Sequence, residues 1–180
     1  MAIGQAVLHY IGTRDARLMR RVHRWRAPRW VRLASIWSTR LGDGWLWYSM
    51  AALILAIGGG QRFRALATSS FAALAGIVLF KCVKHACRRP RPCEQEPHCW
   101  ATILPPDQFS FPSGHTITAF AIAVSLGQLY PQAEPGLFLA ASCIGVSRVL
   151  LGMHYLSDVV AGALFGAAIG FGSYHLFALL

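Results

Sequence analysis

Three short clusters of polar residues stand at the edges of apolar runs, and their side chains are of the kinds that handle phosphate groups. The first cluster holds Lys84, Arg89 and Arg91, and five lysines and arginines occupy residues 81–91. Arginine offers a planar fork of donors to two phosphate oxygens, and lysine offers a compact charge. Phosphate binding is one interpretation of this cluster. The alternative is a plain basic stop at the end of a membrane span.

The second cluster is Pro112–Ser113–Gly114–His115, which opens another apolar run. Proline and serine suit the start of a helix, where free N–H groups and the helix dipole favour an anion. Gly114 would let a ligand approach the backbone closely, and His115 would lie beside that ligand. A capped helix with an incidental histidine explains the same residues equally well.

The third cluster contains Ser147, Arg148, His154 and Asp158. His154 and Asp158 are four residues apart, so on a helix they would face the same way. A carboxylate bonded to one ring nitrogen fixes the tautomer and leaves the other nitrogen free to attack or to accept a proton. A bend near Gly152 would bring Arg148 to the same place. The alternative is a polar turn that joins two spans.

Five apolar stretches must position these clusters. Hydrophobic residues make up 55% of the 180 residues and charged residues 13%, about half the usual charged share. Backbone groups in lipid must be bonded internally, so we expect helices that form an all-α polytopic membrane bundle with about five transmembrane helices. The first and fourth stretches are short for a span. The stretches are Gly44–Ile57, Ala65–Val83, Gly114–Tyr130, Gly136–Leu151 and Val159–Leu179.

The order of these stretches brings the three clusters to one side of the membrane. The second span ends at Lys84 and the third begins at His115, with only a loop between them. The fourth returns to Arg148, and the fifth leaves from Asp158. Three cations, two histidines and one carboxylate at one mouth predict a site for a phosphoryl group. The long polar loop from His85 to Phe111 is of the kind that carries function.

The N-terminal part of the chain has a different character. Nine arginines lie between Arg14 and Arg40, interrupted by apolar residues at the spacing of one helical face. Pro28 is expected to divide this stretch into two helices. We favour an interfacial amphipathic segment over residues 1–43, with arginines toward headgroups and tryptophans toward the acyl boundary, followed by the transmembrane domain over residues 44–180. An ordinary basic surface is the alternative, and no cleavable signal peptide is expected.

The three clusters together resemble the signature motifs of the type 2 phosphatidic acid phosphatase superfamily. The motifs are Lys84-x6-Arg91-Pro92, Pro112-Ser113-Gly114-His115 and Ser147-Arg148-x5-His154-x3-Asp158, with no departure at a signature position. The resemblance extends from about residue 42 to the C-terminus, and the small size is similar to that of bacterial undecaprenyl diphosphate phosphatases. Membrane members typically have six spans, so the first span is the one missing from a count of five.

The resemblance implies a role for each motif residue. His154 would be the nucleophile that forms a phosphohistidine, Asp158 would orient it, and His115 would be the general acid. No metal and no cofactor is implied. The phosphate oxygens would be bound by Lys84, Arg91, Ser113, Gly114 and Arg148, with Arg89 and Ser147 as additional candidates.

The expected function is therefore that of a metal-independent membrane lipid phosphatase. Undecaprenyl diphosphate is the first candidate substrate, and phosphatidylglycerophosphate, phosphatidic acid and lipid A are the alternatives. Vanadate-dependent halide oxidation and an inactive lipid-binding or transport protein are rivals from other classes. Despite the net charge of +10, nucleic acid is not an expected partner, because the apolar runs leave little soluble surface. Membrane lipids are expected partners, and the oligomeric state is not predicted.

Two kinds of sequence feature indicate opposite orientations in the cytoplasmic (inner) membrane. With five spans, the motif face carries 15 of the 17 lysines and arginines, which places it in the cytoplasm by the positive-inside rule. Phosphate binding would equally explain the six of those cations that surround the motifs, however, and the resemblance implies the periplasmic side, where bacterial relatives usually act. A disulfide between Cys93 and Cys99 would also require an oxidising compartment. The periplasmic face is favoured. The cysteine spacings fit no common zinc site.

Overall fold

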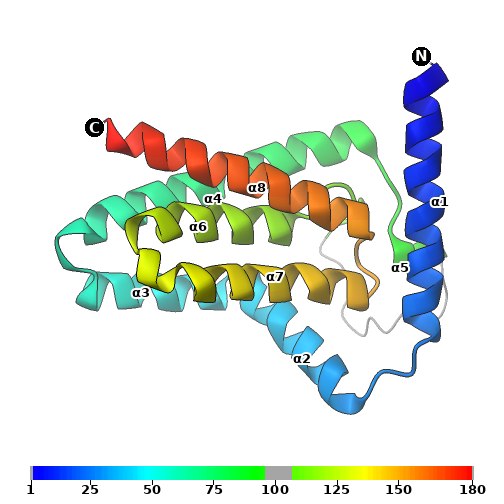
Figure 1. Cartoon of the computed structure of the whole chain (residues 1–180), viewed down its shortest axis with the longest axis horizontal. Coiled ribbons are helices and arrows are strands. Elements are labelled where there is room, and N and C mark those ends of the chain that lie inside the picture. The colour runs from blue at the N-terminus through cyan, green and yellow to red at the C-terminus, as the bar shows by residue number, and fades with distance from the viewer. Residues whose placement is uncertain (1, 96–106, 180) are drawn as a thin grey trace.

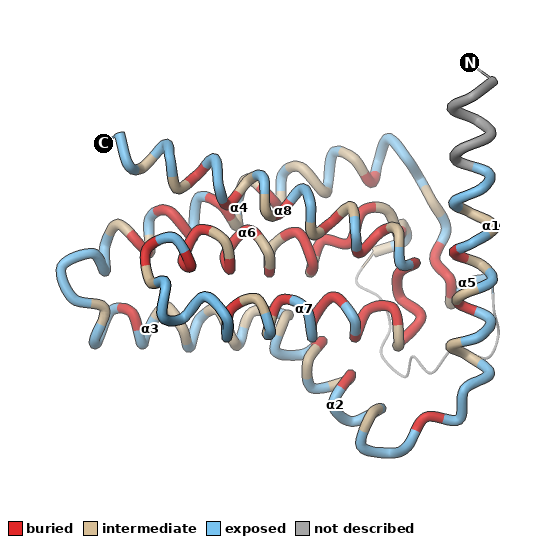
Figure 2. Tube along the Cα trace, viewed as in Figure 1, coloured by how far each residue is buried: buried red, intermediate tan, exposed pale blue. Residues whose placement is uncertain are grey.

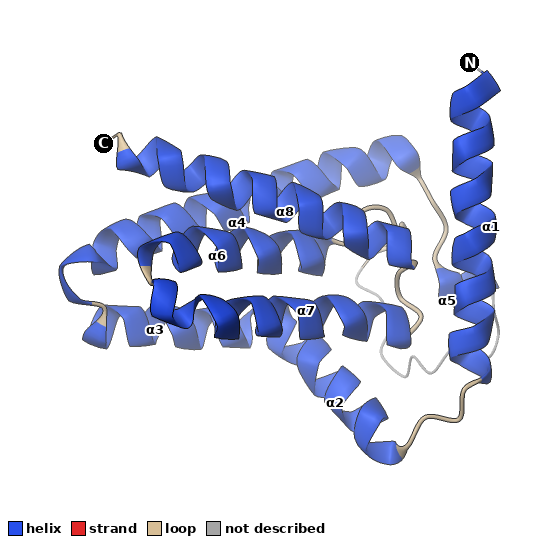
Figure 3. Ribbon diagram, in the orientation of Figure 1, coloured by secondary structure: helices blue, strands red, loops and turns tan. Residues whose placement is uncertain are grey.

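All regular elements in the part of the chain that the structure describes are helices (Figure 3). The structure is a computed structural model that describes residues 2–95 and 107–179. The predicted Cys93–Cys99 disulfide involves a residue outside these ranges. The α-helices are α1 (Ala2–Arg24), α2 (Arg29–Arg40), α3 (Leu46–Ile57), α4 (Arg62–Cys87), α5 (Pro92–Gln95), α6 (Gly114–Leu129), α7 (Glu134–Leu150) and α8 (Leu156–Ala178), with shorter helical turns η1 (Leu41–Trp45), η2 (Gly59–Gln61) and η3 (Pro131–Ala133).

Five helices, α3, α4, α6, α7 and α8, run along one common direction and form the bundle (Figure 1). Each predicted apolar stretch coincides with most of one of these helices, which confirms the all-α bundle. Helix α6 lies at its centre and is buried along most of its length (Figure 2). The end of α4, the start of α6, the end of α7 and the start of α8 meet at one end of the bundle, as the order of the stretches predicted.

The helix lengths differ from the expected ones at two places. Within residues 2–95 and 107–179, three segments are long and apolar enough to span a bilayer: Gly59–Gln95, Pro131–Leu150 and Leu156–Ala178. The fourth stretch is therefore long enough, because η3 extends α7 backwards to Pro131. Helix α6 is shorter than a full span, with 16 residues that rise only about 24 Å, and α3, with 12 residues, is short as expected for the first stretch.

Glycines fix the contact between α6 and α8. Gly162, Gly166 and Gly170 recur every four residues on α8, and a Cβ atom on Gly166 would lie 2.4 Å from the backbone oxygen of Ile117. A Cβ atom on Gly170 would likewise lie 2.5 Å from the backbone oxygen of Ala121. Small residues at this spacing allow two membrane helices to approach with their backbones almost touching. The two helices that begin at the polar end are thereby held in a fixed register.

Large apolar side chains cover the outside of the bundle. Leu53, Phe71, Leu139 and Leu164 are each more than 40% exposed. Such a surface is unfavourable in water but matches the hydrocarbon core of a bilayer. The core lies inside and is built around α6, with Ala119, Ile122, Ala123 and Leu126 among its members.

The N-terminal helices lie outside the bundle. Helix α1 ends at Arg24 and α2 begins at Arg29, so the predicted break at Pro28 is confirmed. Figure 1 shows α1 nearly at right angles to the bundle axis, across the polar end. Met19 is fully buried there against Val149, Tyr155 and Val159. This orientation is the one that an amphipathic helix in the headgroup layer would have.

The glycine contact leads to a first prediction. Gly166→Ala should lower the thermal unfolding midpoint in detergent, because the added methyl group must push α6 and α8 apart, at a cost of about 1–3 kcal/mol. Gly172→Ala is the matched control on the same helix, since no atom lies within 4 Å of its added Cβ. Circular dichroism during heating would measure both. Equal midpoints for the two variants would contradict the close-packed contact.

Candidate functional site

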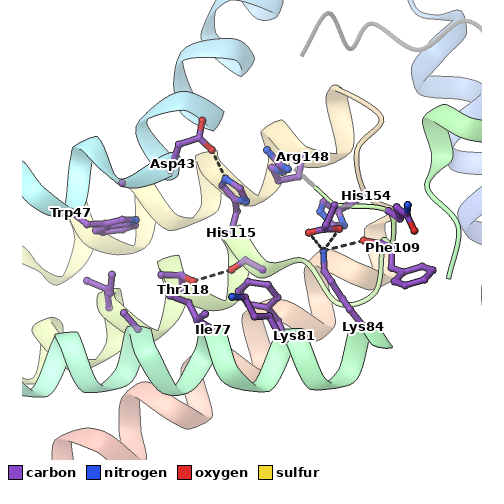
Figure 4. Close-up of a pocket in the computed structure, with 18 of the residues that line it drawn as sticks. Asp43, Trp47, Ile77, Lys81, Lys84, Phe109, His115, Thr118, Arg148 and His154 are labelled. Atoms are coloured by element: carbon purple, nitrogen blue, oxygen red, sulfur yellow. Dashed lines mark hydrogen bonds and ion pairs between the residues drawn. The ribbon is translucent and has the colours of Figure 1, made fainter. Parts of the chain in front are cut away.

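A cavity of about 910 Å³ opens at the end of the bundle where the three polar clusters meet (Figure 4). All three clusters contribute to its wall, so their predicted convergence is confirmed. The motif residues on the wall are Lys84, Arg91, Gly114, His115, Arg148 and His154. The remaining wall comes from η1, α3, α4, α6 and residues 107–109, and its α3 and α4 part is largely apolar.

The turn after α4 is bonded to the turn after α7. Helix α4 ends where Arg88 takes the left-handed conformation, with φ of 46°. The chain then brings Arg91 inward, where its Nη1 donates to the backbone oxygen of Met153 at 2.7 Å. The backbone N–H of Cys93 donates to Gly152 O at 3.1 Å. The first and third clusters are therefore held together by hydrogen bonds and do not depend on a ligand for their proximity.

Asp107 occupies the cationic part of the cavity. Its two carboxylate oxygens each lie 2.7 Å from Lys84 Nζ, and one of them lies 2.6 Å from Arg91 Nη2. Burial would raise the pKa of Asp107, but the hydrogen bonds from Lys84 and Arg91 outweigh it and lower that pKa below its usual value. A charged carboxylate thus sits where these two cations would hold an incoming anion.

Arg148 has donors that no described residue accepts. Its side chain is 2% exposed, and Nη1 donates to Thr39 Oγ1 at 3.1 Å. Within residues 2–95 and 107–179, neither Nε nor Nη2 has a hydrogen-bond partner. Buried N–H groups are rarely left unpaired. Since this guanidinium also lines the cavity, its vacant donors are suited to an anionic ligand.

A bend after α7 places His154 beside Arg148, as expected. Gly152 has φ of +67°, a conformation that glycine adopts without strain. The backbone N–H groups of Met153 and His154 both donate to Arg148 O, at 3.0 and 3.1 Å. The tight turn that they close returns the chain to the cavity.

The expectation that His154 and Asp158 share a helical face is wrong. Helix α8 begins at Leu156, so His154 precedes it. Asp158 is at the third helical position, where its Oδ2 accepts the backbone N–H of Tyr155 at 2.8 Å. The same oxygen lies 3.7 Å from His154 Nδ1. The pair is adjacent because the carboxylate reaches back past the helix start.

The neighbours of His154 determine where its lone pair lies. Nε2 is 3.3 Å from Arg91 Nη1. A guanidinium only donates, so Nε2 is the acceptor and Nδ1 carries the proton in the neutral ring. Burial, followed by the positive charges of Arg148, Arg91 and Lys84, lowers the pKa of His154 well below the usual histidine value. The ring is therefore neutral, with a lone pair directed at the cations.

His115 begins α6 and is paired with a residue that the sequence analysis did not single out. Its Nε2 lies 2.6 Å from Asp43 Oδ1 (Figure 4). Ser113 precedes the helix but makes no capping hydrogen bond with its side chain, contrary to expectation. Its Oγ accepts from Thr116, and its N–H donates to the backbone oxygen of Asp158. Ser113 is fully buried and is not on the cavity wall.

Arg89 and Ser147 also lie away from the cavity wall. Arg89 was an additional candidate for phosphate, but its Nη1 donates to Asp158 Oδ1 and its Nη2 to Asp15 Oδ2, both at 2.7 Å. Ser147 shares a hydrogen bond of 3.0 Å with Thr39. Both residues support motif residues in this structure.

The polar partners of the motif residues were not predicted from the sequence. The chain has only seven acidic residues, and all four of its aspartates are bonded at this site. That scarcity of acidic residues in a strongly basic chain is the observation that could have indicated them. The missed residues are Asp15, Thr39, Asp43 and Asp107.

Among residues 2–95 and 107–179, no group of three or more histidine, cysteine or acidic side chains is placed to hold a metal ion. The cations around the cavity have the charge that a metal would otherwise supply to phosphate oxygens.

Comparison with known proteins bears on the family. The family model described as "PAP2 superfamily" matches residues 64–179. A Mycobacterium tuberculosis protein named decaprenylphosphoryl-5-phosphoribose phosphatase is 32% identical over 127 residues, which cover 71% of this chain and 68% of that protein. An undecaprenyl-diphosphatase of Sulfolobus acidocaldarius is 28% identical over 137 residues, covering 76% of this chain and 66% of that protein.

A solved structure has the same fold. The transmembrane PAP2 type phosphatidylglycerolphosphate phosphatase from Bacillus subtilis aligns with a TM-score of 0.73 over 97% of this chain and 90% of that one. The two sequences are 23% identical, so this likeness concerns the fold alone.

The environment of His154 gives a second prediction. In ¹⁵N-histidine NMR spectra of the protein in detergent, the ring that disappears in His154→Ala should stay neutral at pH about 6.5, where an ordinary histidine is half protonated. The pKa of His154 is lowered because burial and the neighbouring cations both disfavour the charged ring. A half-protonated His154 ring at that pH would contradict the buried, cation-flanked environment.

The position of Asp107 gives a third prediction. Asp107→Asn should lower the Kd for inorganic phosphate at least tenfold, because it removes a competing anion whose charged hydrogen bonds contribute about 1.5–3 kcal/mol. Glu134→Gln, at the far end of the bundle, is the matched control. Calorimetric titration would measure both. Weaker phosphate binding by Asp107→Asn would instead show that the carboxylate is needed to position Lys84 and Arg91.

Proposed function

The chain belongs to the PAP2 superfamily, and we propose from this premise that it removes phosphate from a membrane lipid through a phosphohistidine on His154, without a metal ion. It is an integral membrane protein with phosphatase relatives of the same family. The observation that carries the proposal is that His154, with Nε2 beside Arg91, lines one cavity with His115 and with the buried Arg148, two of whose donors have no partner among the described residues.

The reaction would proceed in two steps. In the first, His154 Nε2 attacks phosphorus, a nitrogen–phosphorus bond forms, and the bond to the leaving oxygen breaks. His115 gives its proton to that oxygen. In the second step, water attacks phosphorus, His115 takes up a proton from that water, and the nitrogen–phosphorus bond breaks. Phosphate is released and both histidines return to their starting states.

The surrounding residues have supporting roles in this proposal. Lys84, Arg91 and Arg148 stabilise the charge on the equatorial oxygens, as a metal ion does in other phosphoryl transfers. Asp158, whose Oδ2 lies 3.7 Å from His154 Nδ1, would accept a hydrogen bond from that N–H and stabilise the positive ring once phosphorus is bound. Asp107 must leave Lys84 and Arg91 when the phosphate arrives. Gly114 lies on the wall, where a side chain would meet the ring of Phe80 at 3.1 Å.

A lipid substrate is supported by the two ends of the cavity. The cations and histidines are at one end. Trp47 from α3 and Ile77 from α4 lie toward the other (Figure 4). A lipid could place its phosphate at His154 while its first apolar groups lie between α3 and α4. Water-soluble phosphate esters would leave that apolar part without a partner.

Undecaprenyl diphosphate is the substrate that we propose first. Lys81 and His85 also line the cavity beyond Lys84, and these two side chains could bind the second phosphate of a diphosphate. The named activities of the relatives include a polyprenyl diphosphatase and a polyprenyl-linked phosphatase. Phosphatidylglycerophosphate is the alternative, in keeping with the name of the Bacillus subtilis structure.

We place the site at the periplasmic face of the inner membrane in this proposal. Many of the basic residues near the site are bonded within it. Arg89, Arg91 and Arg148 all have partners there, so they are weak indicators of the cytoplasmic side. The resemblance to bacterial family members, which usually act on the periplasmic side, supports the same face.

The proposal predicts phosphate release that resists EDTA and requires His154. Purified protein in detergent would be tested on undecaprenyl diphosphate, phosphatidylglycerophosphate, phosphatidic acid and lipid A. His154→Ala should lose essentially all turnover, because no covalent intermediate can form. His175→Ala, with an exposed histidine at the other end of α8, is the matched control and should retain activity. Turnover by His154→Ala, or its loss with EDTA, would refute the proposed chemistry.

A further inference from the structure

We propose that Asp43 is a positioning residue for His115, so that the site contains two histidine–aspartate pairs, one for each reacting histidine. The proposal rests on the proposed function, in which His115 protonates the leaving oxygen. Asp43 lies outside the residues that match the family, 64–179. It comes from η1, the turn that links the N-terminal segment to α3.

The pairing is a direct contact. The ring Nε2 of His115 lies 2.6 Å from Asp43 Oδ1, shorter than the 3.7 Å between His154 and Asp158. The hydrogen bond from His115 is the main reason that the pKa of Asp43 lies below its usual value. Asp43 is therefore a charged acceptor, and it fixes one ring nitrogen of His115 so that the other is the nitrogen that can deliver a proton.

The backbone around Asp43 is built for this contact. Residues 41–45 join α2 to α3 across a kink, with a non-helical backbone at Gly44. A Cβ on Gly42 would lie 3.0 Å from Ile144 and 3.4 Å from the His115 ring, so a glycine lets the turn approach the histidine. Gly44 has φ of +132°, which L-residues rarely adopt. Glycines on both sides thus allow a backbone path that presents Asp43 to His115.

The other charged groups near His115 explain why it needs a carboxylate. It faces Arg148 from α7 and Lys84 from α4, and His154 lies beyond them. Arg40 is a further cation that acts on Asp43. A protonated ring beside these cations is unfavourable unless an anion is bonded to it. A general acid must nevertheless hold its proton until the leaving oxygen takes it.

The remaining aspartates are engaged elsewhere. Asp107 is bonded to Lys84 and Arg91. Asp158 is bonded to Arg89 and to the backbone of Tyr155, and Asp15 is bonded to Arg89. Asp43 is therefore the aspartate available to His115, and its loss leaves no described carboxylate in contact with that ring.

The test compares Asp43→Asn with wild type on two substrates. Phosphatidic acid has an alkoxide leaving group that requires protonation, whereas p-nitrophenyl phosphate has a leaving group that requires little. General acid catalysis is worth about 10²–10⁴-fold, so we expect kcat on phosphatidic acid to fall at least tenfold and kcat on p-nitrophenyl phosphate to change little. The basic limb of the pH profile should move to lower pH, because the ring loses its proton more easily without the carboxylate.

Three further variants make the outcome decisive. Asp43→Glu keeps a carboxylate and should restore part of the lost activity, Glu134→Gln should behave as wild type, and adding Asp43→Asn to His115→Ala should cause no further loss. Equal losses on both substrates, or full additivity with His115→Ala, would overturn the role of Asp43. Wild-type protein that releases no phosphate, or activity that survives His154→Ala, would overturn the proposed function itself and this inference with it.

Discussion

Burying positive charge at the end of an apolar bundle is the constraint on which this structure depends. Lys84, Arg91 and Arg148 are at most 5% exposed, and unpaired charges in such surroundings cost several kcal/mol each. The chain meets this constraint by bringing its few aspartates to the same place. Asp107 is ion-paired with two of the cations and compensates one positive charge, while two donors of Arg148 have no hydrogen-bond partner in the described part of the chain. The buried positive charge is therefore only partly compensated, and an anionic ligand would supply about the negative charge that is missing.

The N-terminal segment takes part in the site although its composition sets it apart. Asp15 of α1 bonds Arg89, Thr39 of α2 bonds Arg148, and Asp43 bonds His115. A division of the chain after residue 43 remains a prediction based on composition. The contacts cross that division at three points, so the helix that lies across the bundle end is coupled to residues that touch the reacting histidines.

The bundle and the motif residues could be predicted from sequence because each depends on local information. Apolar stretches define helices, and their order alone brings Lys84, His115 and His154 to one end. The contacts of Asp43 and Asp107 could not be predicted, because they join residues 72 and 23 positions apart through turns without a periodic pattern. The relation of His154 to Asp158 was misjudged for a similar reason, since the four-residue spacing is equally compatible with a residue that precedes the helix.

The carboxylate of Asp107 has a consequence for inhibitors. Because Asp107 is attached to the chain, it competes with any added inhibitor for Lys84 and Arg91. Its effective concentration there is about millimolar or above and does not depend on how much inhibitor is added. A small anionic fragment would have to displace it and would be expected to score poorly in a screen. A compound that gains its affinity from Trp47, Ile77 and Phe80 meets no such competitor. The apolar part of the cavity is thus the better starting point for selective ligands.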